Sequence, residues 1–87
     1  MKLKYDFAIQ EVADNFVAVG RDRKTGDVAK VLKLNETGAV ILQGLLDGAD
    51  TVAIVSRLLE EYDVEPQEAE REVNAFLDML TESELVQ

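Results

Sequence analysis

Hydrophobic and polar residues alternate in short runs along the first third of the chain, and this pattern predicts β-strands. The runs span residues 7–12, 16–20 and 28–34 and are rich in β-branched and aromatic side chains. Turn-forming residues 13–15 and a polar loop at residues 22–27 separate them. Because these connections are short, the sequence predicts three strands that follow one another as an antiparallel meander.

Apolar residues recur at helical spacing through the rest of the chain, and they predict three helices. Asn35 is suited to cap the first helix, which ends near Gly48. Asp50 or Thr51 caps the second, and Pro66 suits the first turn of the third. The apolar residues at helical spacing are Gly38, Ile41, Leu42, Leu45 and Leu46 in the first helix; Val55, Leu58, Leu59 and Tyr62 in the second; and Ala69, Val73, Phe76, Leu77 and Leu80, expected to be the buried stripe, in the third. Strands followed by helices indicate an α+β fold, a three-stranded antiparallel sheet and then a three-helix bundle.

The length of 87 residues is enough for one domain. No linker, internal repeat or low-complexity segment divides the chain, so residues 1–87 are expected to form a single domain. Residues 1–6 lack the apolar run that is typical of a signal peptide, and no stretch approaches membrane-spanning length. We therefore expect a cytoplasmic protein without a membrane partner.

The chain contains neither histidine nor cysteine. The commonest general base, the commonest metal ligand and the thiolate nucleophile are therefore missing, and no Ser-His or Cys-His pair can form. Glu60, Glu61, Asp63 and Glu65 form an acidic cluster, but their spacing is not that of a calcium loop. We expect no catalytic residue, no metal site and no cofactor, and hence a binding protein, not an enzyme.

The formal net charge is −9, and it is unevenly distributed. Residues 1–34 contain seven Lys or Arg and five Asp or Glu, whereas residues 35–87 contain two and thirteen. An acidic surface of this size repels a phosphate backbone, so no nucleic-acid partner is expected. The asymmetry is consistent with two halves that present different faces to a partner. The alternative is a solvated acidic surface that keeps the protein soluble.

The helical half carries an ordered set of residues with a distinctive spacing. The set comprises Leu34-Asn35-Glu36-Thr37-Gly38, Ile41-Leu42, Leu45-Leu46-Asp47-Gly48, Thr51-Val52, Ile54-Val55, Leu58, Tyr62-Asp63-Val64, Val73, Phe76-Leu77, Leu80 and Leu85-Val86. With this set the chain resembles the PqqD family over roughly residues 5–87. It departs from the family at Leu42, where Trp is frequent, and at Glu84, where Gly is frequent.

The resemblance implies a winged helix-turn-helix domain that recognises peptides. PqqD-like proteins, also called RiPP recognition elements, bind the leader segment of a ribosomally synthesised precursor peptide and present it to a modifying enzyme. In pyrroloquinoline quinone synthesis that enzyme is a radical S-adenosylmethionine (radical SAM) enzyme. The expected partners are thus a precursor peptide and a radical SAM or other modifying enzyme. The resemblance also implies that the leader adds as a strand to the third strand, in a groove bounded by the third helix.

Two segments supply the candidate peptide-binding residues. On the third strand they are Ala29, Lys30, Val31, Leu32 and Lys33, since strand addition draws on main-chain hydrogen bonds and on pockets for alternate side chains. Lys30 interrupts an otherwise apolar face and is suited to meet an acidic side chain of the peptide. Alternatively, Lys30 and Lys33 are edge charges that suppress aggregation.

On the third helix the candidates flank the apolar stripe. Glu70, Asn74 and Leu77 lie four and three residues apart and are placed to line the expected groove. The alternative is that Glu70 and Asn74 are merely solvated while Leu77 belongs to the core.

Two other functions stay open at this point. A structural adaptor, or a homodimer that pairs through its own strand edge, fits the same elements. A DNA-binding winged helix would use the third helix for recognition, but residues 66–84 carry six acidic residues against Arg71 alone.

Overall fold

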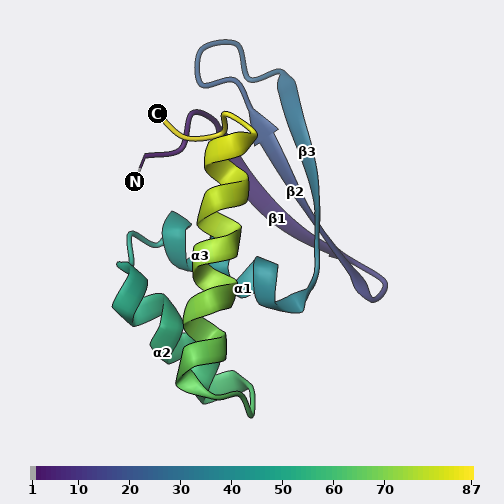
Figure 1. Cartoon of the computed structure of the whole chain (residues 1–87). Coiled ribbons are helices and arrows are strands. Elements are labelled where there is room, and N and C mark those ends of the chain that lie inside the picture. The colour runs from purple at the N-terminus through teal and green to yellow at the C-terminus, as the bar shows by residue number, and fades with distance from the viewer. Residues whose placement is uncertain (1) are drawn as a thin grey trace.

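The computed structural model describes residues 2–87, in which three strands precede three helices (Figure 1). The elements are β1 (Asp6–Val12), β2 (Asn15–Arg21), β3 (Val28–Leu34), α1 (Glu36–Leu46), α2 (Thr51–Glu61) and α3 (Pro66–Glu82). The strands form one sheet in the order β1-β2-β3, and both neighbouring pairs are antiparallel. This arrangement confirms the predicted α+β fold and the predicted meander.

Local chemistry determines where the helices begin and end. The side chains of Asn35 and Asp50 each accept a hydrogen bond from the backbone N–H three residues later, at 2.8 and 2.9 Å. Pro66 lies in the first turn of α3, where its missing N–H would have no helical partner in any case. Gly48 follows α1 with a φ of 80°, which costs a glycine little. The predicted helix boundaries are confirmed at these positions.

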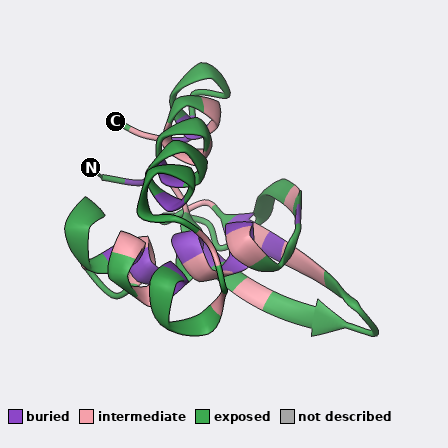
Figure 2. Cartoon of the chain, turned by 60° about the horizontal axis from the view of Figure 1, so that its bottom comes forward, coloured by how far each residue is buried: buried purple, intermediate pink, exposed green. Residues whose placement is uncertain are grey.

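Two apolar clusters hold the layers together, and the helices cover one face of the sheet (Figure 2). The first cluster joins the sheet to α1, α3 and the end of the chain and is centred on Phe7, Ala18, Leu34, Leu42, Leu80 and Leu85. The second joins the three helices and consists of Ile41, Ile54, Leu58, Ala69 and Val73. Because α1 contributes to both clusters, it connects the sheet to α2 and α3.

The inner face of β3 is only partly covered. Leu34 is buried and Leu32 is half-buried, as expected for residues that face the helices. Val28 would face the helices in a regular strand, but it is 51% exposed. The register shifts so that Val28 pairs with Arg21, which leaves Ala29 as an extra residue in β3 and turns Val28 to the outer face of the sheet.

The last residues of the chain pair with the first described ones. Leu3 and Val86 form an antiparallel bridge, and Leu85 is buried. On either side of the bridge, the N–H of Lys4 donates to the C=O of Leu85 at 2.9 Å, and the N–H of Gln87 donates to the C=O of Lys2 at 2.8 Å. Both chain ends lie on the side of α3 that is away from β3 (Figure 1). The tail therefore leaves the free side of β3 uncovered. Among residues 2–87, no helix combines the length and the hydropathy that crossing a membrane requires.

Candidate functional site

The outer edge of β3 carries unpaired main-chain groups. β3 is an edge strand with β2 on one side, and no backbone hydrogen bond within residues 2–87 reaches its other side. Alternate residues of an antiparallel strand direct their N–H and C=O groups away from the partner strand. About half of the seven residues of β3 therefore present a free donor and a free acceptor, which is a template for an added strand.

The final helix runs beside this edge at a distance. No Cα atom of α3 lies within 8 Å of a Cα atom of β3, and in Figure 1 β1 and β2 are seen between the two elements. An added strand lies about 4.8 Å from the strand that it joins. Because α3 stays more than 8 Å away, it does not occupy the position next to β3 that an added strand would take.

A hollow of about 320 Å³ lies where β3 leads into α1. Gly38 lines one wall, and Phe76 and Met79 of α3 line the other. A Cβ atom at Gly38 would lie 2.9 Å from Oδ1 of Asn35 and 3.4 Å from Cε2 of Phe76, so the capping side chain of Asn35, more than the Phe76 ring, favours glycine here. The lining is mainly apolar, with Glu72 as an acidic neighbour. It suits an apolar side chain of a guest segment.

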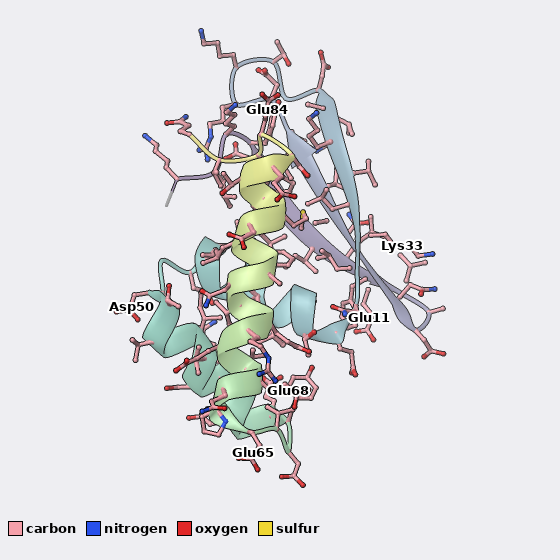
Figure 3. The ribbon with its side chains drawn as sticks, viewed as in Figure 1. Glu11, Lys33, Asp50, Glu65, Glu68 and Glu84 are labelled. Carbon is pink, nitrogen blue, oxygen red and sulfur yellow. The ribbon has the colours of Figure 1, made fainter. Side chains whose placement is uncertain are left out.

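The structure brings the predicted β3 residues to this edge. Ala29, Lys30, Val31 and Lys33 are exposed, and Leu32 is half-buried. Side chains alternate along the strand, so Lys30 and Leu32 lie on the inner face with Leu34, while Val31 and Lys33 lie on the outer face. Figure 3 shows Lys33 directed away from the helices.

The predicted α3 residues lie elsewhere. Glu70 and Asn74 line a separate hollow of about 230 Å³ between α2 and α3, together with Val52 and Val55 of α2. Leu77 is half-buried and packs against both apolar clusters, so it belongs to the core. The structure does not bring Glu70 and Asn74 together with β3.

The residues that face the β3 side of α3 are Phe76 and Met79, which the sequence analysis did not include in the site. They lie on the flank of the apolar stripe opposite to Glu70 and Asn74. Helical periodicity identifies the stripe but not which neighbour lies beside each flank. The sequence does contain one signal for the choice of flank: Phe76 and Met79 on this flank are apolar, whereas Glu70 and Asn74 on the opposite flank are polar.

A third hollow of about 370 Å³ lies between the β1–β2 hairpin and the helices, lined in part by Ile9, Phe16 and Tyr62. Burial raises the pKa of Tyr62, and the nearby carboxylates of Glu36, Glu61 and Glu72 raise it further. Its hydroxyl is therefore neutral at physiological pH. Within residues 2–87 no three His, Cys, Asp or Glu side chains are grouped as metal ligands would be.

Residues 22–86 match the PqqD family, described as coenzyme PQQ synthesis protein D. The chain is also similar to the solved structure of TbiB1 in complex with the TbiA(beta) leader peptide, with a TM-score of 0.75 and 26% identity, covering 100% of this chain and 95% of that one. A structure of lasso peptide synthetase B1 complexed with the leader peptide gives a TM-score of 0.69 and 30% identity, covering 94% and 91%. No curated protein matches the sequence.

Fold and site define a class: a small α+β domain with a three-stranded antiparallel sheet, in which the edge strand β3 has a free outer side. The two similar structures have this fold over nearly their whole length. The chain belongs to the PqqD family, because the family match covers three quarters of its residues. This confirms the resemblance that the spacing of its helical residues indicates.

Proposed function

We propose that this protein binds the leader segment of a ribosomally synthesised precursor peptide and presents it to a modifying enzyme. The leader adds to β3 as a fourth strand, between β3 and α3. The observation that carries the proposal is the unpaired outer edge of β3 beside a helix that stays more than 8 Å away between Cα atoms. Membership of the PqqD family and two similar structures that contain leader peptides support it.

Main-chain hydrogen bonds supply only part of the affinity. Each contributes about 1 kcal/mol net, because the peptide gives up hydrogen bonds to water. Buried side chains must supply the rest, at about 25 cal/mol for each Å² of apolar surface removed from water. We assign that role to the hollow lined by Phe76 and Met79, and the main-chain contacts to residues 29–33. Glu70 and Asn74 are not included, since they face α2.

The remaining features of the proposal concern the protein as a whole. Residues 1–87 act as one peptide-recognition domain in the cytoplasm, and the protein carries no catalytic residue of its own. The chain lacks histidine and cysteine, which supports a binding role. The chemistry would come from the partner, a radical SAM or other peptide-modifying enzyme.

The test is a titration of the ¹⁵N-labelled protein with synthetic leader peptides, taken from the short reading frames beside its gene. We expect amide signals of β3, Phe76 and Met79 to shift. Alternate amides of β3 should become protected from hydrogen exchange, because only those bond to the added strand. Protection on the free edge of β1, or no change at β3 with any of these peptides, would contradict strand addition.

Backbone methylation of the peptide provides a matched control. A single N-methyl group removes one donor while leaving every side chain in place. In a strand that joins β3, every second N–H group donates to β3 and the intervening ones point away. A single N-methyl group at any of the donating positions should therefore abolish binding, and one at any of the intervening positions should be tolerated. Equal loss at both sets would indicate another binding mode.

A further inference from the structure

The regular part of β3 runs from Lys30 to Leu34. Its last residue, Leu34, is buried, whereas the four before it, Lys30-Val31-Leu32-Lys33, are not. The register places these residues across from Gly20, Val19, Ala18 and Val17 of β2. The irregularity in β3 lies just before it, at Ala29. A strand added on the free side of this segment continues the same cross-strand rows, so each of its residues gains a defined neighbour.

The two lysines have no partner in these rows. Lys30 lies across from Gly20 and Lys33 across from Val17, so neither meets a charge on β2. Both are exposed, and neither forms an ion pair with any residue from 2 to 87. They lie on opposite faces of the sheet, because they are three residues apart in a strand. Glu72, the acidic residue of the hollow, lies near Asn35, at the end of β3 that carries Lys33, but Lys33 is on the outer face of the sheet and is directed away from the helices.

The two residues between the lysines are apolar. Val31 is 63% exposed on the outer face and continues a row that contains Val19 and Ala8. Leu32 is half-buried on the inner face, where it packs against the first apolar cluster. An apolar guest residue beside each would cover surface that now faces water.

From this arrangement we propose that β3 selects a guest segment with the order acidic, apolar, apolar, acidic. The acidic side chains pair with Lys30 and Lys33 on the two faces of the sheet, and the apolar ones cover Val31 and Leu32. The order reads the same in both directions, so it holds whether the guest runs parallel or antiparallel to β3. The inference rests on the proposed function and adds the chemistry of the recognised segment.

The competing role of the two lysines is protection of an open edge against self-association. Any charge fulfils that role, whatever its sign. Recognition of acidic residues, in contrast, requires positive charge. Reversal of the charge therefore separates the two roles.

Three synthetic peptides serve as probes: Glu-Val-Leu-Glu, Gln-Val-Leu-Gln and Lys-Val-Leu-Lys, each flanked by two threonines at either end. Each is titrated into the ¹⁵N-labelled protein, and the shifts of the β3 amides give the dissociation constant. We expect the acidic peptide to bind about tenfold more tightly than the lysine peptide, since two attractive pairs replace two repulsive ones. The difference should shrink as the salt concentration rises.

The variant K30E/K33E should reverse the order of affinity and favour the lysine peptide. The control K4E/K24E makes the same change in net charge at two exposed lysines away from the edge, and it should keep the order of the native protein. Dispersed amide spectra confirm that each variant is folded. The inference is overturned if the native protein binds the acidic and lysine peptides equally or neither, or if the control also reverses the order.

The test of the recognition pattern can fail without the proposed function failing. If a natural leader protects alternate β3 amides while the designed peptides show no charge preference, the recognition pattern is wrong and strand addition stands. If no natural leader perturbs β3, the proposed function itself fails.

Discussion

Replacement of Gly20 by alanine is expected to destabilise the protein. Gly20 lies in the central strand across from Phe7, whose buried ring rests on the glycine backbone. A Cβ atom at this position would lie 2.7, 3.0 and 3.1 Å from three carbon atoms of the ring. The φ angle of Gly20 is not in the left-handed region, so the ring and not the backbone conformation opposes the substitution.

The magnitude follows from these distances. Carbon atoms pack at about 3.5–4.0 Å, so the Phe7 ring has to move by roughly 1 Å within a packed core. Overpacking of this kind costs about 1–3 kcal/mol. The lower backbone entropy of alanine in the unfolded chain offsets about 0.5–1 kcal/mol. The expected net loss is about 0.5–2 kcal/mol, and each kcal/mol lowers the melting temperature of a domain of this size by about 4–8 °C.

Urea unfolding followed by circular dichroism measures the loss, and a double-mutant cycle with Phe7→Leu tests its cause. Leucine withdraws the atoms that meet the new Cβ, so Gly20→Ala should cost less than about 0.5 kcal/mol in that background. If Gly20→Ala leaves stability unchanged, or costs the same in both backgrounds, contact with the Phe7 ring is not what requires the glycine.

Three further predictions concern local features. Ala13 has a φ of 56° in the β1–β2 turn, so Ala13→Gly should raise the free energy of unfolding by about 0.5–1 kcal/mol in urea titrations. Asn35→Ala removes the cap of α1 and should lower that free energy by about 1 kcal/mol in the same assay. Hydrogen bonds from Arg57 and Gln43 lower the pKa of Asp47, so Asp47→Asn should reduce the melting temperature at pH 7. The depressed pKa stabilises the fold above the ordinary value of 3.8, so the difference in melting temperature should close as the pH falls below it.

The sequence determines the features that depend on local chemistry. Asn35 marks the start of α1 because its side chain accepts a hydrogen bond from the N–H three residues later. Pro66 marks the start of α3 because it has no N–H to donate. The structure confirms both. The position of β3 at an edge also follows from sequence, since a three-strand meander leaves its third strand with a single neighbour.

Features that depend on tertiary geometry were not accessible in this way. The rotation of α3 about its axis decides that Phe76 and Met79, and not Glu70 and Asn74, lie on the side of β3. Alternation along the third strand likewise cannot show that Val28 faces outward, because the register shift at Arg21 arises from pairing between strands. Both features require the packed structure.

The bridge between Leu3 and Val86 determines where another protein can be fused to this domain. It gathers the two chain ends at one attachment point, on the far side of α3 from β3. A fluorescent protein or an enzyme joined at Gln87 would therefore extend away from the docking edge and leave it accessible to cargo. The domain is thus suited to serve as a detachable peptide-capturing unit, and under the proposed recognition pattern the K30E/K33E variant would provide a second unit with the opposite charge preference.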